Sequence, residues 1–164
     1  MANAKKPIPE GYHAITPQLT VDDAARAIDW YKKALGAEEV GRSNGPDGKV
    51  MHAELKIGSS RIFVNDPVMD SKGPKAYGGS PAALWLYVED CDALFKRAVT
   101  AGAQVRMPVD NQFWGDRMGA FVDPHGYSWS VATRKEDLTK EEMDRRGQEF
   151  FKAFAKKQPQ PVHT

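Results

Sequence analysis

The sequence predicts an α+β domain made of two tandem βαβββ modules and a further helix at the C-terminal end. The first observation is a repeat: residues 19–24, LTVDDA, and residues 86–91, LYVEDC, each end an expected strand and open an expected helix. The second is that both helices end in Gly-Ala, at Gly36 and Gly102, where glycine suits the left-handed conformation that often terminates a helix. Because an internal repeat fixes the architecture, we expect the two copies to share one fold.

The composition excludes several classes of partner. The chain has 164 residues, of which 41% are hydrophobic and 27% charged, as in one ordinary globular domain. Its 23 basic and 22 acidic residues give a net charge of +1, so we expect no nucleic-acid partner and no binding to a membrane. The single cysteine, Cys91, cannot form an internal disulfide, which favours a cytoplasmic protein. No apolar run approaches the roughly 18 residues of a membrane span.

Module one is predicted over about residues 12–66. A helix over 23–35 follows from apolar residues at helical spacing, with Asp22 or Asp23 as its N-cap; these residues are Ala24, Ala27, Ile28, Tyr31 and Leu35. Residues 50–57 alternate as in a strand. Met51, Ala53, Leu55 and Ile57 should face one side, and Val50, His52, Glu54 and Lys56 the other.

Module two is predicted over about residues 83–134 and repeats the pattern. Its helix should cover 90–101, and strands 119–123 and 127–133 should be joined by the type I turn that Asp-Pro-His-Gly favours.

Two segments lie outside the modules. The connector 67–82 is rich in glycine and proline and should be exposed. Beyond module two, Thr139 and Glu142 form a capping-box pattern, which predicts a C-terminal helix over about 139–157.

Four stretches carry a family pattern: AARAIDWY at 24–31, DGKVMHAEL at 47–55, WGDR at 114–117 and DPHGY at 123–127. With these stretches the sequence resembles the vicinal oxygen chelate superfamily, which includes glyoxalase I, extradiol dioxygenases and bleomycin-resistance proteins. The WGDR stretch resembles a narrower subgroup associated with phosphonate-degradation genes. The resemblance implies that each module forms a curved half-barrel, that the concave faces enclose a ligand cleft, and that the protein is a homodimer.

The resemblance also implies four positions for a divalent metal, which members of the glyoxalase type bind through His or Glu. In this sequence Thr16, Ala83 and Ser130 stand at three of them, and the fourth falls on Ile62 or Phe63. Since none of these side chains is a usable ligand of such metals, we expect no metal and no other cofactor.

A second, unconventional site is conceivable on the strand 50–57. His52 and Glu54 are two residues apart, so they share one face of the strand at about 7 Å. The pair can be an unusual metal site, an acid–base pair, or a polar strand face open to water. The catalytic residues are therefore unknown, with His52 and Glu54 as candidates.

The same register brings other side chains to the concave faces. Gln18 follows from Thr16, and Trp85 and Tyr87 follow from Ala83 at a spacing of two. Two aromatic rings can stack on a flat ligand, or they can fill the cavity as core.

The loop 110–117 combines aromatic and charged residues at the edge of the second sheet. Arg117 can grip a carboxylate or phosphate, or it can pair with Asp116 and stiffen the loop. Trp114 can be a packing anchor or a wall of the cleft.

The sequence favours a metal-independent protein that binds an aromatic or planar small molecule, as bleomycin-resistance proteins do. The near-neutral charge argues against a strongly cationic ligand. The alternatives are a metal-dependent lyase, isomerase or dioxygenase with unusual ligands, and a metal-free lyase.

Overall fold

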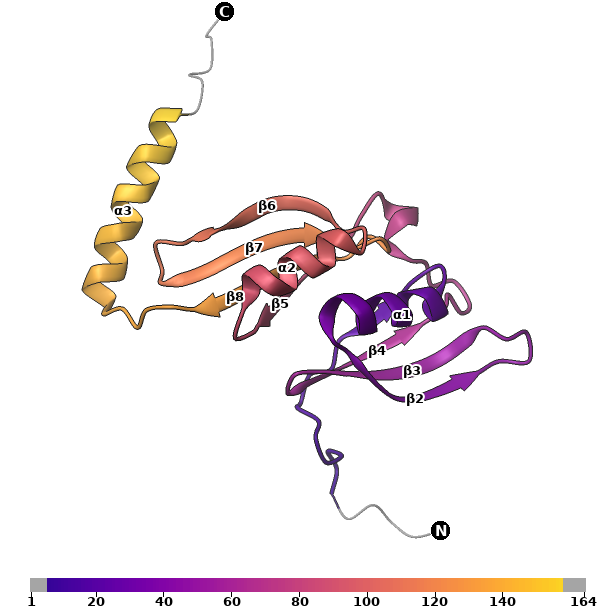
Figure 1. The fold of residues 1–164 in the computed structure, drawn as a ribbon. Coiled ribbons are helices and arrows are strands. Elements are labelled where there is room, and N and C mark those ends of the chain that lie inside the picture. The colour runs from indigo at the N-terminus through magenta and orange to yellow at the C-terminus, as the bar shows by residue number, and fades with distance from the viewer. Residues whose placement is uncertain (1–5, 158–164) are drawn as a thin grey trace, which may run out of the picture.

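The computed structural model describes residues 6–157 and contains two four-stranded sheets and three α-helices (Figure 1). The elements in chain order are β1 (Gln18–Thr20), α1 (Ala24–Leu35), β2 (Glu38–Asn44), β3 (Val50–Ile57), β4 (Ser60–Asn65), the short 3-10 helix η1 (Pro74–Tyr77), β5 (Ala83–Tyr87), α2 (Cys91–Thr100), β6 (Gln104–Asn111), β7 (Asp116–Val122), β8 (Ser128–Arg134) and α3 (Lys140–Lys157).

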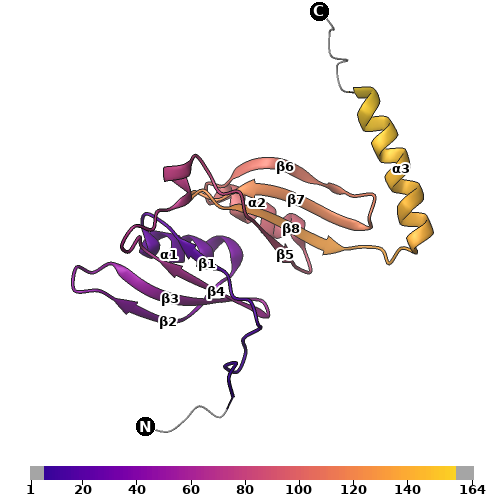
Figure 2. The ribbon, with the colours of Figure 1, turned by 180° about the vertical axis from the view of Figure 1, so that it is seen from behind.

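Both modules have the predicted βαβββ topology. The strand order is β1-β4-β3-β2 in the first sheet and β5-β8-β7-β6 in the second. The first strand of each module pairs parallel with the last, and the other neighbours are antiparallel. The views in Figures 1 and 2 show α1 and α2 covering one face of their respective sheets. Within residues 6–157 no helix lies over the opposite face of either sheet, and we call that face the open face.

Capping residues fix the ends of the two repeated helices, α1 and α2. Asp23 is the N-cap of α1, because its Oδ1 accepts a hydrogen bond from the Arg26 backbone N at 3.0 Å. Asp90 caps α2 in the same way through the Ala93 backbone N, at 2.9 Å. Gly36 ends α1 with φ of 70°, a conformation that glycine adopts without strain.

The core lies between each sheet and its helix. Ile28 and Tyr31 of α1 are fully buried against Leu55 of β3 and Val64 of β4. Burying such a side chain contributes roughly 1.5–3 kcal/mol. In the second module Phe121 and Trp129 are buried in the same continuous core. The predicted helical stripe is therefore confirmed as the buried face.

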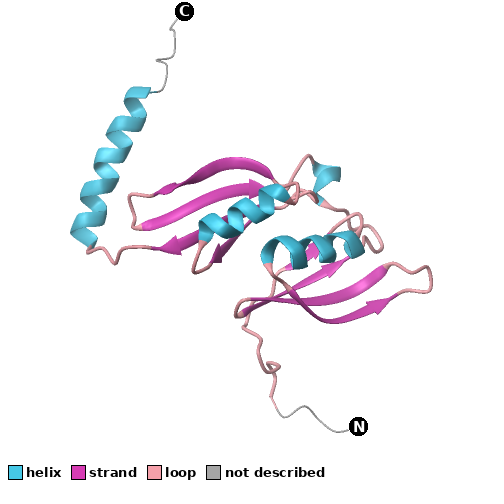
Figure 3. Ribbon diagram, in the orientation of Figure 1, coloured by secondary structure: helices cyan, strands magenta, loops and turns pink. Residues whose placement is uncertain are grey.

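The modules are joined through their helices, which lie side by side (Figure 3). Trp30 Nε1 on α1 donates to the Ala101 carbonyl at the end of α2, at 2.8 Å. Arg97 Nε on α2 donates to the Ala34 carbonyl on α1, also at 2.8 Å. A third tie is buried: the Tyr31 hydroxyl donates to Asp123 Oδ2 at 2.9 Å.

Asp123 is the centre of this third tie. Its Oδ2 also accepts from Trp129 Nε1 at 2.9 Å, and its Oδ1 accepts from the backbone N of His125 and of Tyr127. Burial, followed by the neighbouring Asp123 charge, raises the pKa of Tyr31 well above its usual value, so the phenol stays protonated and donates. The Asp-Pro-His-Gly turn thus also connects the modules.

Two local predictions are wrong. Val50 is buried and Met51 is 47% exposed, the reverse of the faces expected at the start of β3. The pairing of β2 with β3 shifts between Ser43 and Asn44, and this irregularity interrupts the alternation. The connector, in turn, is not exposed throughout. Pro74 of η1 is buried, and an added Cβ on Gly126 would lie 3.0 Å from the Pro74 side chain.

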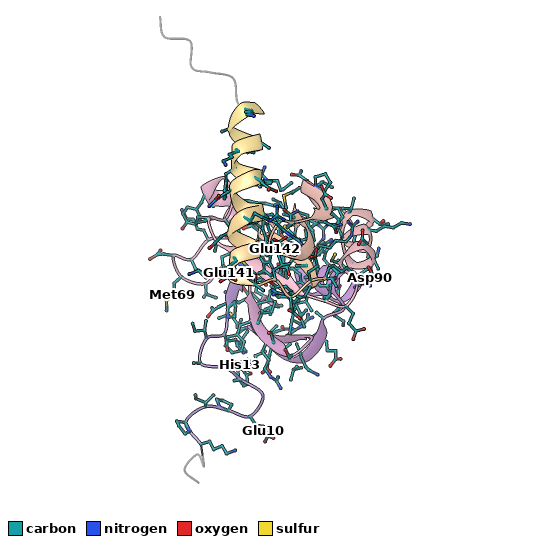
Figure 4. The ribbon with its side chains drawn as sticks, turned by 90° about the vertical axis from the view of Figure 1, so that its left-hand side faces the viewer. Glu10, His13, Met69, Asp90, Glu141 and Glu142 are labelled. Carbon is teal, nitrogen blue, oxygen red and sulfur yellow. The ribbon has the colours of Figure 1, made fainter. Side chains whose placement is uncertain are left out.

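The C-terminal helix α3 lies at the far end of the second sheet, away from module one (Figures 1 and 2). Figure 4 labels Glu141 and Glu142 on its first turn. The Glu142 backbone N donates to Thr139 Oγ1 at 3.2 Å, as the capping-box pattern predicts. Phe113 holds α3 to the β6–β7 hairpin, with ring centroids 5.2 Å from Phe150 and 5.8 Å from Phe151. Within residues 6–157, none of the helices has the length and apolarity that crossing a bilayer requires.

Candidate functional site

The open face of module two is a ladder of cross-strand rows, which the strand register defines. The first row holds Gln104, Val122, Ser128 and Ala83; the second Met107, Ala120, Ser130 and Trp85; the third Asp110, Met118, Ala132 and Tyr87; the fourth Asp116 and Arg134. Successive rows are two residues apart along β5, β7 and β8, or about 7 Å, whereas irregularities in β6 make the spacing there three residues. Small side chains dominate β7 and β8 in these rows, so the aromatic side chains of β5 stand above the surface.

Trp85 and Tyr87 are adjacent on this face and largely uncovered. Trp85 is 49% exposed and Tyr87 57%, with ring centroids 6.1 Å apart at an interplanar angle of 41°. A fully packed core tryptophan in this chain, Trp129, is only 3% exposed. The alternative that Trp85 and Tyr87 merely fill a core therefore does not describe this structure.

Trp85 also borders a cavity of about 260 Å³ between the modules. This cavity lies between the edge strand β5 and the β3–β4 hairpin, and its lining is mainly apolar, including Ile57, Ile62, Leu84 and Leu86. The indole therefore lies between the open face and this cavity. A mainly apolar lining is usual for a ligand pocket.

Tyr87 is held by a buried carboxylate. Its hydroxyl donates to Asp116 Oδ2 at 2.8 Å, and Trp114 Nε1 donates to the same oxygen at 3.0 Å. This hydrogen bond to Asp116, followed by partial burial, raises the pKa of Tyr87 above its usual value. The phenol proton points to Asp116, so the lone pairs of the Tyr87 oxygen are left to accept a hydrogen bond.

The second oxygen of this carboxylate is unusual. Asp116 is 2% exposed, and its Oδ1 has no hydrogen-bond partner among residues 6–157. The Arg134 guanidinium lies 3.9 Å from it and offsets part of the charge. A buried carboxylate oxygen without a hydrogen bond is energetically costly, and the described residues supply no donor for this one.

Arg117 lies on the other side of the sheet. Its Nε and Nη2 donate to Asp92 of α2 at 2.7 and 2.6 Å, so it ties β7 to the helix. Of the two alternatives for Arg117, the pairing with Asp116 is wrong, because consecutive residues of a strand point to opposite faces. Trp114 and Asp116 lie with Tyr87 at the open face, whereas Arg117 does not.

The open face of module one carries His52, Glu54 and Gln18. His52 packs against Phe63, with ring centroids 4.6 Å apart. Glu54 forms an ion pair with Arg61, which also stacks over the Tyr12 ring at 4.9 Å. Gln18 donates to Asn65 Oδ1 at 2.9 Å. Sequence reasoning missed Tyr12 and Arg61, because the pair is 49 positions apart and has no spacing signal.

His52 and Glu54 share the open face, as the strand register predicts, but they do not act on each other. Within the described residues no hydrogen bond joins them, and Arg61 engages the Glu54 carboxylate. A carboxylate so neutralised is a poor general base.

The metal positions that the resemblance implied can be assigned from the pairing. In module two, Trp85 follows the position Ala83 by two residues and pairs with the position Ser130. In module one, Gln18 follows Thr16 by two residues and pairs with Phe63. The undecided fourth position is therefore Phe63 and not Ile62. Thr16, Phe63, Ala83 and Ser130 form a donor set with two hydroxyls and no imidazole or carboxylate. This set does not fit a divalent metal of the glyoxalase kind. Within residues 6–157, no group of three or more His, Cys, Asp or Glu side chains is placed to bind one elsewhere.

Comparison with known proteins identifies a family and several relatives. The model of the Glyoxalase/Bleomycin resistance protein/Dioxygenase superfamily matches residues 12–131. An uncharacterized protein of Mycobacterium tuberculosis is 44% identical over 135 residues, which cover 79% of this chain and 79% of that protein. The crystal structure of TioX from Micromonospora sp. ML1 is 25% identical, with a TM-score of 0.60 over 77% of this chain and 100% of that one. An X-ray structure of an Arabidopsis thaliana gene product is 27% identical, with a TM-score of 0.60 over 74% of this chain and 98% of that one.

Proposed function

Because the chain belongs to the glyoxalase/bleomycin resistance protein/dioxygenase superfamily, we propose that it binds a small flat molecule on the open face of module two, without a metal ion. The observation that carries this proposal is the exposed pair Trp85 and Tyr87. Two neighbouring aromatic rings offer large apolar surfaces to a flat ligand, and leaving them in water has no structural benefit.

The polar groups around the pair support a fixed orientation of the ligand. The Tyr87 oxygen can accept one hydrogen bond, because its proton is committed to Asp116. Such a combination of apolar walls and a few directed polar atoms is typical of small-molecule sites. The donor set at the family's metal positions supports binding without a metal.

The acid–base alternative at His52 and Glu54 has less support. Its carboxylate is bound by Arg61 on the same face, and the His52 ring packs against Phe63 at an interplanar angle of 58°. A metal-free lyase at this pair would first have to break the Glu54–Arg61 ion pair.

We also propose a homodimer. Within residues 6–157 no helix or strand covers either open face, and the edge strands β1 and β5 each pair with a single neighbour. A second copy can cover an open face and convert it into a cleft.

Calorimetric titration of chelator-treated protein with naphthylmethanol, a neutral flat probe, tests the binding proposal. We expect saturable binding that is lost or strongly weakened in Trp85→Ala and unchanged when zinc, nickel or manganese is added back. Binding that appears only after a metal is restored would contradict the metal-independent part. Binding that is indifferent to Trp85 would contradict the site.

A further inference from the structure

A groove with a volume of about 1060 Å³ runs along the first row of the open face of module two. One wall is the connector with η1, including Lys72, Lys75 and Tyr77, and the other is the start of β6 with Gln104 and Arg106. Val122 and Ser128 form part of its floor. This volume lies near the upper end of the range of small-molecule sites.

The charged side chains that line this groove are all basic. Lys72, Lys75 and Arg106 line it, and among the residues the structure describes no Asp or Glu does. None of the three forms an ion pair within residues 6–157, although most arginines of the chain do, such as Arg61, Arg117 and Arg146. Asp22 and Asp23 border a separate small pocket on the other side of Lys75. Three cations around one hollow, none of them in an ion pair within the described residues, produce a local positive potential, which Asp22 and Asp23 reduce on the far side of Lys75.

The groove and the aromatic pair belong to one surface. Ser128 of the groove floor pairs with Ala83, and the next row along the same two strands pairs Ser130 with Trp85. Measured along the strands, the row of Ser128 is therefore about 7 Å from the row of Trp85 and about twice that from the row of Tyr87, and the groove cations stand in the walls that flank the row of Ser128. A single molecule of modest size can contact both ends.

We infer that the ligand of module two carries an anionic group, a carboxylate or a phosphate ester, which Lys72, Lys75 and Arg106 bind while its flat part stacks on Trp85. This inference rests on the proposed function, because it names the chemical class of the same ligand. Arg106 can form paired hydrogen bonds to either anion, and the lysines add point charges. The hydroxyl of Ser128 and the amide of Gln104 provide further donors in the floor.

The test compares three probes that share one ring: naphthylmethanol, naphthylacetate and naphthyl phosphate. We expect at least one anionic probe to bind the wild-type protein about tenfold or more tightly than the alcohol at low salt, with a preference that shrinks as salt rises. The carboxylate and phosphate arms identify which anion the groove takes. The triple variant Lys72→Gln, Lys75→Gln, Arg106→Gln should lose the preference.

A matched variant controls for net charge. Lys33→Gln, Lys49→Gln, Lys96→Gln removes the same three charges from exposed positions on α1, α2 and the β2–β3 hairpin, and it should keep the preference. Equal affinities for the alcohol and both anions in the wild-type protein, with Trp85-dependent binding of the alcohol, would overturn this inference alone. Loss of the preference in both triple variants would also overturn it. Failure of every probe to bind would overturn the proposed function as well.

Discussion

Replacing Trp85 by alanine should weaken ligand binding more than folding. About half of the side chain is exposed, since the residue is 49% accessible. For an indole that can bury roughly 250 Å², a ligand stacked on one ring face covers roughly 60 Å² of this exposed half. At about 25 cal/mol per Å², the lost contact amounts to about 1.5 kcal/mol, or about a tenfold weaker affinity. Trp85→Phe keeps an aromatic face and should recover most of this loss.

The stability of the same variants gives the decisive comparison. Trp129 is 3% exposed and donates to Asp123, so Trp129→Ala should lower the free energy of unfolding by about 3–5 kcal/mol. Trp85→Ala should cost about 1–2 kcal/mol, because only half of its surface is buried. Calorimetry with naphthylmethanol measures the affinity, and urea unfolding measures the stability. If Trp85→Ala costs as much stability as Trp129→Ala and the folded fraction binds the probe with unchanged affinity, the indole is a core residue and the stacking argument is refuted.

Three further outcomes follow from the structure. Light scattering should give twice the 18.2 kDa chain mass at micromolar concentration, and the mass of a single chain would contradict the homodimer. An added Cβ on Gly119 would lie 2.8 Å from Phe95 and from Val109, so Gly119→Ala should lower the unfolding free energy by about 1–3 kcal/mol in urea, whereas Gly41→Ala, with open space around it, should not. Burial lowers the pKa of His125 in the folded state, so its contribution to stability is present above the unfolded pKa of about 6.5 and is lost as the pH falls below it. Urea titrations between about pH 7 and pH 5 should therefore show a shallower loss of stability in His125→Asn, and an unaltered slope would refute this role.

The fold could be predicted from the sequence because its determinants are local and occur twice. The Asp caps, the Gly-Ala helix ends and the helical stripe of α1 each specify an element within a few residues, and the repeat then specifies the topology. The interrupted alternation at Val50 could not be predicted, because it depends on how β2 pairs with β3 and not on the composition of either strand.

The candidate site was only partly predictable, for a related reason. The alternation of side chains along β5 places Trp85 and Tyr87 on one face. The same alternation along β7 separates Asp116 from Arg117, which sequence proximity alone had suggested as partners. The groove cations come from a glycine-rich connector and from a distant strand. Nothing in the spacing of Lys72, Lys75 and Arg106 shows that they surround one hollow.

The Asp123 tie has a mechanical consequence. On β8, Ser128 and Ser130 lie on the open face, and Trp129 between them points to the opposite side. Trp129 donates a hydrogen bond to Asp123 Oδ2, which also accepts one from the Tyr31 hydroxyl of module one. One strand thus forms both the floor of the candidate site and the anchor of the joint. Any shift of β8 caused by an occupant on the open face acts directly on α1 of the other module, because packed interiors transmit displacement and do not absorb it. The hydrogen bonds of Trp129 and Tyr31 to Asp123 thus couple the position of β8 to that of α1.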